Sequence, residues 1–216
     1  MFRSIHTFPR SNIGKGPLVI TASSNVVAFL LYCFVQGITP GPANTVSFAS
    51  GVAFGTRCCL RQWLGLVAGF LAVSVASFLL LWMLGNGASE LLPLISWAGV
   101  GYILYLAVHM LRATPQVAEA STQRPTFRRG FLVQATNAKI AIACIAAYSS
   151  YVLPHTQQPA LLMLAVVAMP LVGTLCNLVW LVCGGLLTGF YAKHAKPMNI
   201  LMAAALALCA LTMLPL

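Results

Sequence analysis

Lys139 stands in the middle of an apolar stretch that covers residues 131–153. A charged side chain at the centre of a membrane helix costs about 2.5–3.5 kcal/mol on translocon insertion scales, so it commonly marks a functional site. The chain has only two acidic residues, Glu90 and Glu119, and neither lies in an apolar stretch. We therefore predict that Lys139 binds the carboxylate of a substrate.

Structural explanations of Lys139 compete with this hypothesis. The lysine could stay neutral, or it could bond backbone carbonyls for purely structural reasons. Snorkelling to the membrane interface is strained, because Lys139 lies nine residues from Gly130. That separation is about 13 Å along a helix, roughly twice the span of a lysine stem.

Residues 38–44, ITPGPAN, interrupt the first apolar segment. Proline lacks an N–H and clashes with the carbonyl four residues before it, so two carbonyls lose their helical donors. Loose carbonyls at membrane depth suit a substrate ammonium, and the alternative is a simple proline kink. We predict a substrate-binding break formed by Gln36, Ile38, Thr39, Pro40, Gly41, Pro42 and Asn44.

A second interruption, QATNAK, leads into Lys139 in the fourth apolar segment. Gln134 and Asn137 add polar groups beside the lysine, and we include both in the substrate site. In the fifth segment, Asn177 needs a hydrogen-bonding partner if it is buried in lipid. We include it in the site, either as a support for the substrate-binding residues or as a contact between helices.

The composition predicts an all-α integral membrane protein, since 60% of residues are apolar, 6% are charged and the mean hydropathy is +0.90. Helices are favoured over a β-barrel because the apolar runs are continuous. Crossing the hydrocarbon takes about 20 residues. We predict six transmembrane helices at residues 25–48, 64–85, 91–111, 131–153, 160–187 and 198–216.

The two broken helices are the first and the fourth, so they hold equivalent places in two halves of three helices each. An odd number of spans per half inverts the second half relative to the first. This predicts a 3+3 inverted repeat, in which paired broken helices lie near the midplane and one half rocks against the other. We assign residues 23–216 to a single six-helix transporter domain.

Basic residues predict the orientation, because cytoplasmic loops carry the excess of Lys and Arg. They follow the first, third and fifth segments, at Arg57, Arg61, Arg112, Arg124, Arg128, Arg129, Lys193 and Lys196. We expect a multi-pass inner-membrane protein with both termini in the periplasm. The net charge of +10 is a topology signal that anionic lipid can assist, and the scattered basic residues do not indicate nucleic-acid binding.

Three basic residues near the N-terminus, Arg3, Arg10 and Lys15, disagree with this orientation. A secretory signal peptide is disfavoured because no cleavage site follows the helix-length apolar run, and a transit peptide fits the Arg and Ser content. We expect residues 1–22 to be a disordered or mis-annotated extension, with translation starting near Val19.

The residue patterns do not favour a metal site, a cofactor-binding site or an enzyme active site. Five of the seven cysteines lie in apolar runs, where they act as small hydrophobic residues. Cys58 and Cys59 are adjacent in an expected cytoplasmic loop, where thiols stay reduced. No CxxC, HxxxH or HExxH pattern occurs, and no nucleophile stands at useful spacing from a base.

These motifs resemble those of the LysE/RhtB family of bacterial amino-acid exporters, over the chain from about Val26 to the C-terminus. The match rests on Thr39-Pro40-Gly41-Pro42 and on Asn137 with Lys139. Further motifs resemble the cysteine/O-acetylserine exporter branch: SWAG at 96–99, Gln134, VLP at 152–154, Gly173-Thr174 with Asn177 and Trp180, and Asn199-Ile200. The resemblance implies a secondary exporter of small neutral amino acids in the inner membrane, driven by the proton gradient.

Two positions depart from the family pattern. Ala43 stands where many members have a polar or acidic residue, which weakens the case for proton coupling through a carboxylate. Ala138 stands where many have proline, so we expect a shallower break in the fourth segment.

We hypothesise alternating access around a midplane cavity. Lys139 and nearby donors hold the substrate carboxylate, while the freed carbonyls, with Thr39 and Asn44, hold its ammonium. Burial favours a neutral lysine and a bound carboxylate favours a charged one, so substrate binding and lysine protonation should be linked. A cation or metal-ion efflux transporter on the same scaffold is the alternative. The sequence leaves open the actual substrate, the coupling stoichiometry and whether the protein works as a homodimer.

Overall fold

The computed structural model describes residues 18–84 and 124–187 continuously, with isolated helical positions at 97, 101, 104–105, 108, 193–194, 196–197, 200–201, 204 and 207. The regular structure of these residues is entirely helical. The helices are α1 (Leu18–Ile38), α2 (Pro42–Phe54), α3 (Thr56–Leu84), α6 (Phe127–Ala135), α7 (Ala138–Ala147), the π-helical turn η2 (Tyr148–Val152) and α8 (Pro159–Leu186).

Four of the six expected segments coincide with these helices. Helices α3 and α8 are each long and apolar enough to cross a membrane. The pair α1 and α2 is bent by 49°, and the pair α6 and α7–η2 by 57°. Each pair is long and apolar enough for one broken span or for a re-entrant loop, and we treat each as a broken span. The expected third and sixth segments lie largely outside the described residues, and a total of six spans stays a prediction.

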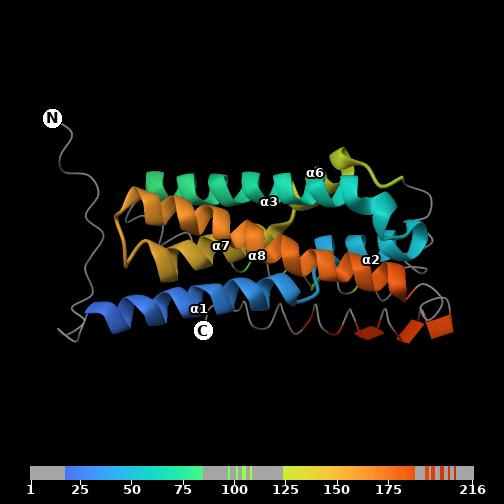
Figure 1. The fold of residues 1–216 in the computed structure, drawn as a ribbon, viewed down its shortest axis with the longest axis horizontal. Helices are drawn as coiled ribbons and strands as arrows, with labels where there is room; N and C mark the ends of the chain where they lie inside the picture. Colours follow the sequence, from blue (N-terminus) through green and yellow to red (C-terminus); the bar gives the residue numbers. More distant parts are fainter. Residues whose placement is uncertain are drawn as a thin grey trace.

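The helices lie alongside one another (Figure 1). Helix α3 packs against α6, and α2 packs against α8. The first of these contacts depends on glycine, because a Cβ at Gly65 would lie 2.0 Å from the carbonyl oxygen of Phe127, and one at Gly130 would lie 1.9 Å from that of Gln62. Backbones at such separation leave no room for a side chain between them.

Helix α8 continues through Pro170, which cannot donate to the carbonyl of Val166. Ser74 in α3 supplies the missing donor, since its Oγ lies 2.6 Å from the Val166 oxygen. The hydroxyl of Tyr148 lies 2.6 Å from the same Oγ. A neighbouring helix therefore satisfies the carbonyl that the proline frees, and α8 remains one helix.

The expected loop after the first segment is shorter than predicted. Gly55 alone joins α2 to α3, with φ at 75°, a left-handed conformation that glycine adopts without a steric penalty. Arg57, Arg61, Cys58 and Cys59 consequently lie in the first turns of α3, not in a loop. The prediction was wrong here because a single glycine can reverse the chain between two helices.

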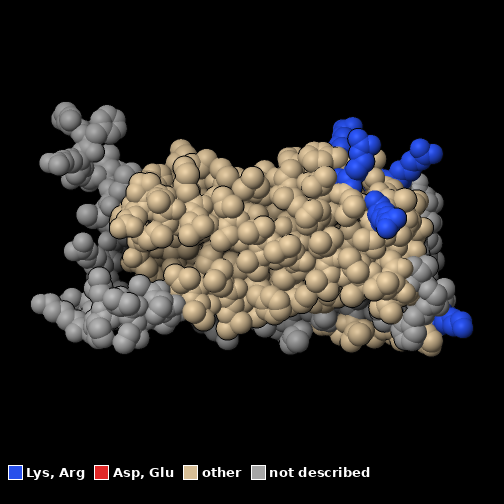
Figure 2. All heavy atoms as spheres, viewed as in Figure 1, with Lys and Arg blue, Asp and Glu red and all other residues tan. Residues whose placement is uncertain are grey.

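Exposed basic side chains gather at one end of the molecule, where α2 ends and α3 and α6 begin (Figure 2). The exposed basic residues that the structure describes are Arg57, Arg61, Arg124, Arg128, Lys193 and Lys196. This placement agrees with the expectation that the three basic regions share one side of the membrane. Arg112 and both chain termini lie outside the described residues.

The outer surface of the helices is apolar. Val27, Leu31, Met83 and Met163 are more than half exposed, at 63%, 60%, 82% and 74%. Large apolar surfaces of this kind are rare on soluble proteins and are typical of lipid-facing helices. Helix α1 already begins at Leu18, so residues 18–22 of the expected N-terminal extension are helical, and residues 1–17 lie outside the described residues.

Candidate functional site

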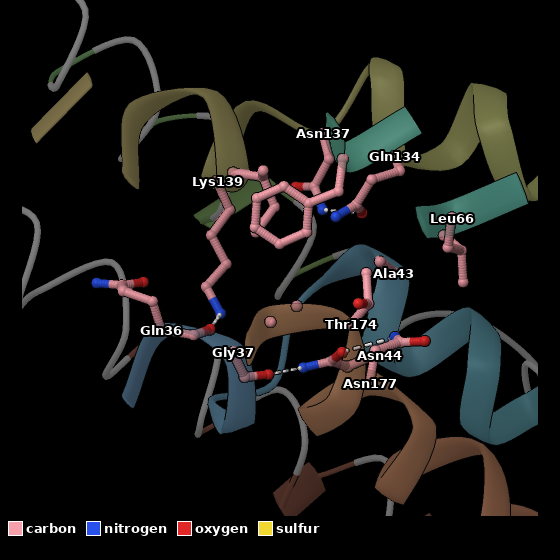
Figure 3. Close-up of a pocket in the computed structure, with 14 residues that line it drawn as sticks. Gln36, Gly37, Ala43, Asn44, Leu66, Gln134, Asn137, Lys139, Thr174 and Asn177 are labelled. Carbon is pink, nitrogen blue, oxygen red and sulfur yellow. Dashed lines mark hydrogen bonds between the residues drawn. The ribbon is translucent and has the colours of Figure 1, made fainter. Parts of the chain in front are cut away.

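The two broken spans meet at Lys139. This lysine lies in the first turn of α7 and is 1% exposed. Its Nζ donates to the carbonyl oxygens of Gln36 at 2.9 Å, Thr39 at 2.8 Å and Pro40 at 3.4 Å, at the end of α1 and in the break that follows it. Figure 3 draws the bond to Gln36. We call these three oxygens the carbonyl cage.

The cage exists because the prolines interrupt helical hydrogen bonding. The carbonyls of Gln36 and Ile38 would each accept from the N–H four residues later, but those positions are Pro40 and Pro42. The Gln36 oxygen accepts from Lys139, and the Ile38 oxygen accepts from Nε1 of Trp180 at 3.1 Å. Side chains from α7 and α8 thus replace the missing backbone donors.

Asn44 and Asn177 brace the same break. Nδ2 of Asn44 donates to the carbonyls of Gly37 at 2.8 Å and Thr39 at 2.9 Å. Nδ2 of Asn177 donates to Oδ1 of Asn44 at 2.8 Å, and the Ser47 hydroxyl donates to Oδ1 of Asn177 at 2.8 Å (Figure 3 draws the two asparagines). Both amides are buried, and their bonds hold the unwound backbone in one conformation.

The second break is sharper than the first, at 57° against 49°, although position 138 is alanine. The expectation that Ala138 makes this break shallower than proline does in other family members stays a prediction. Polar side chains end the helix without proline: Oγ1 of Thr136 donates to the Leu132 carbonyl at 2.8 Å, and Nδ2 of Asn137 donates to Oε1 of Gln134 at 3.2 Å. Asn137 then serves as the N-cap residue of α7 with extended backbone.

Gly41 lets the lysine stem approach the break. A Cβ at this position would lie 2.9 Å from Cδ and 3.4 Å from Nζ of Lys139. Pro42 starts α2, and the hydroxyl of Thr45 donates to the Gly41 carbonyl at 2.9 Å. The Pro-Gly-Pro sequence therefore does three things here: it withholds donors, leaves space for the lysine and begins the next helix.

Beside the lysine lies a cavity of about 20 Å³. One water molecule needs roughly 10–15 Å³ by this measure, so the cavity is far too small for an amino acid. Two buried acceptors in residues that line it, Oδ1 of Asn137 and Oε1 of Gln36, have no hydrogen-bond partner. Such atoms are costly to leave unpaired, and they offer positions for a ligand donor.

Most of the residues predicted from the sequence lie around this cavity. Its lining includes Gln36, Gly41, Asn44, Gln134, Asn137, Lys139 and Asn177. The other four contribute to the break itself: Thr39 and Pro40 give cage oxygens, Ile38 accepts from Trp180, and Pro42 begins α2.

Sequence reasoning did not assign the apolar wall of the cavity, which Leu66, Phe70, Ile140 and Gly173 form, nor Thr174. Leu66, Phe70 and Ile140 carry no signal that separates them from other apolar positions in a membrane helix, whereas Gly173 and Thr174 stand in a motif that resembles the exporter branch. Trp180 could have been found, because it shares a helix face with Asn177 and a buried indole N–H needs an acceptor.

Residues 34–216 match the LysE type translocator family. This chain belongs to that family. The match includes both breaks and Lys139, so the LysE assignment and the site geometry rest on the same part of the chain. Together with the apolar spans, it identifies a membrane transport protein.

Curated relatives within the LysE family are named Cysteine/O-acetylserine efflux protein. The one from Klebsiella pneumoniae subsp. pneumoniae is 30% identical over 185 residues, which cover 86% of this chain and 94% of that protein. Those from Escherichia coli O1:K1 and Salmonella typhimurium are 30% identical over 183 residues and 31% over 184, covering 85% of this chain and 94% of each relative. No solved structure matches the chain.

Proposed function

We propose that this protein is a secondary active exporter of small neutral amino acids, of the cysteine/O-acetylserine class, in the bacterial inner membrane. The observation that carries the proposal is the buried ammonium of Lys139, held against an unwound helix in a chain whose relatives are named for amino-acid efflux. A zwitterion needs one cationic partner and one set of acceptors, and both kinds of group occur here.

In the proposed complex, Lys139 leaves the cage and pairs with the substrate carboxylate. The substrate ammonium then takes the cage oxygens of Gln36, Thr39 and Pro40, which are now occupied by Nζ. Oδ1 of Asn137 is a further acceptor without a partner. Asn44 and Asn177 hold the break in shape, because their amides already bond protein groups. This revises the expectation that Asn44 binds the ammonium directly.

The wall of the cavity supports a small, uncharged substrate side chain. Leu66 and Phe70 are buried at 1% and 3% exposure, and Ile140 at 6%. The Phe70 ring lies so close to Gly173 that a Cβ there would come within 2.4 Å of Cε1. An apolar wall with so little space disfavours bulky or charged side chains, because neither space nor a counter-ion is offered.

The packing of the broken spans supports alternating access. Both halves of the first broken span, α1 and α2, contact α8, and both halves of the second, α6 and α7, contact α3. Each broken span therefore packs against the unbroken span of the other proposed repeat. Movement of one repeat against the other would separate the cage from Lys139 and widen the small cavity toward one side.

Lys139 is the ionisable side chain that lines the cavity, and we assign the coupling proton to it. We place the basic end of the molecule in the cytoplasm, because positive residues are retained on that side. Imposing a pH gradient on loaded vesicles tests the coupling. The rate of export should rise with the gradient, and an uncoupler should return it to the rate measured without a gradient.

Export of labelled cysteine or O-acetylserine from loaded proteoliposomes tests the function. We expect wild-type protein to release both, Lys139→Ala to release neither, and Lys139→Arg to show whether a charge alone suffices. Size-exclusion chromatography in detergent establishes that each variant is folded. Undiminished transport by folded Lys139→Ala would remove the lysine from the mechanism, and no transport by the wild type would remove the substrate class.

A further inference from the structure

The carbonyl cage has the geometry of a binding site for a primary alkylammonium ion. Three oxygens lie within 3.4 Å of one nitrogen, and an ammonium group carries three N–H donors and no acceptor. All three oxygens belong to one short stretch of chain, residues 36–40, in which Gln36 lies in the last turn of α1, and Thr39 and Pro40 lie in the break after it. The ammonium that fills the site belongs to Lys139, which is 99 to 103 residues away in the sequence.

Other parts of the protein maintain the shape of the cage. Asn44 bonds the carbonyls of Gly37 and Thr39, and Trp180 bonds that of Ile38. These contacts act on the Gly37 and Ile38 carbonyls, which lie between cage oxygens along the chain, and on the Thr39 oxygen, which Asn44 shares with Lys139. They therefore fix the direction of the unwound backbone independently of Lys139, and a preformed site loses little binding energy to ordering.

Lys139 fills this site almost completely. The lysine is 1% exposed, its stem passes Gly41 at contact distance, and the cavity beside it holds about 20 Å³. A second ammonium cannot enter while Nζ is in place. The lining of the described cavity contains no acidic residue that could receive a displaced Nζ.

We infer that the cage is an alkylammonium-binding site that Lys139 occupies in the empty carrier, and that this occupancy excludes amines without a carboxylate. The inference rests on the proposed function, because it explains how that site selects a zwitterion. A zwitterion that displaces Nζ offers it a carboxylate in exchange. A simple amine brings no anion, and it leaves the displaced Lys139 ammonium buried without a counter-ion.

The expected discrimination follows from competition. If Lys139 leaves the cage about 1% of the time, binding of a competing ammonium is weakened about 100-fold relative to a vacant cage. Removing the lysine side chain beyond Cβ should therefore create an amine site. Lys139→Ala removes three carbons and the ammonium, and n-propylammonium replaces those atoms.

The test measures binding of n-propylammonium to purified protein in detergent, by calorimetry and by thermal shift. We expect Lys139→Ala to bind it at least about tenfold more tightly than the wild type. Lys139→Met is the matched control, because it fills the space without an ammonium and should not bind the amine. Tetramethylammonium, which has no N–H donor, should not bind Lys139→Ala. Equal binding of n-propylammonium to all three proteins, or to none, would overturn the inference.

A second measurement on the wild type keeps the inference testable if Lys139→Ala is not recovered folded. Serine and ethanolamine differ by one carboxylate, and we expect serine to stabilise the wild type and ethanolamine not to. Stabilisation by both to the same extent contradicts the role of Lys139 as a competitor. The transport assay tests the proposed function separately. If the wild type exports no amino acid but the Lys139→Ala variant binds n-propylammonium, the proposed function is disproved and the inference that the cage binds alkylammonium ions stands.

Discussion

Replacing Trp180 by phenylalanine removes the indole N–H and keeps a smaller aromatic ring, a change in size that the control variant below shares. The indole Nε1 donates to the Ile38 carbonyl at 3.1 Å, and the ring meets the Phe48 ring edge-on, with centroids 6.3 Å apart. A helix would supply this carbonyl with the N–H of residue 42, which is Pro42. Trp180 therefore makes a bond that the backbone cannot make, and its loss leaves a carbonyl unpaired.

Trp63→Phe is the matched control. Nε1 of Trp63 donates to the carbonyl of Thr174, also at 3.1 Å, but that carbonyl lies inside α8 and keeps its helical donor. Leaving a partly buried carbonyl unpaired costs about 2 kcal/mol, whereas losing one extra hydrogen bond costs about 1 kcal/mol. For a chain of this size each kcal/mol lowers the melting temperature by roughly 2–4 °C.

Thermal unfolding of both variants in one detergent measures the difference. We expect Trp180→Phe to lower the melting temperature by about 4–8 °C and Trp63→Phe by about 2–4 °C. Export should slow in Trp180→Phe, because the cage loses a brace, and should stay near the wild-type rate in Trp63→Phe. Equal losses of stability in the two variants would refute the reasoning that Pro42 makes Ile38 dependent on the indole.

Three further predictions concern packing, selectivity and sidedness. Gly65→Ala places Cβ 2.0 Å from the Phe127 carbonyl oxygen, so size-exclusion chromatography should show little folded protein. Gly101→Ala is the control and should be recovered normally, because its Cβ meets no described atom within 4 Å. Equal recovery of the two variants would contradict the close contact of α3 and α6. Phe70→Leu removes an aromatic ring from the cavity wall, so added leucine should inhibit the export of labelled cysteine more strongly in this variant than in the wild type. Equal inhibition in the two proteins would show that Phe70 does not determine selectivity. Cys58 is exposed at the basic end, so an impermeant maleimide should label it in inside-out vesicles but not in intact spheroplasts. Cys58→Ser is the control for labelling of other cysteines. The reverse pattern would place the basic end in the periplasm.

The first break and the burial of Lys139 could be predicted because their causes are local. Pro40 and Pro42 lack an N–H wherever they stand, so two carbonyls had to lose their helical donors. A lysine nine residues inside an apolar run cannot reach the interface. The positions of α3 and α8 could be predicted from long continuous apolar runs. The prediction was accurate to within a few residues for α8 but less accurate for α3, because the first turns of α3 are basic and lie outside the apolar run.

The second break shows where local reasoning was insufficient. The sequence predicted an interruption at residues 134–139, and we expected a shallower one because Ala138 replaces the proline that many family members have. The helix breaks here without proline: the Thr136 hydroxyl donates to the Leu132 carbonyl, and the Asn137 amide donates to the side-chain oxygen of Gln134. Such side-chain bonds compete with the helix in a way that residue type alone does not decide.

The sequence by itself determined that two carbonyls would be free and that one cation would be buried, because a missing N–H and an apolar run are properties of the residues. Only the tertiary structure decided which donors meet which carbonyls. Lys139 and Trp180 reach the first break from 100 and 142 residues away, and their contacts depend on how α7 and α8 pack against α1. The hypothesis of open carbonyls awaiting an ammonium thus became a cage already filled by the protein's own lysine.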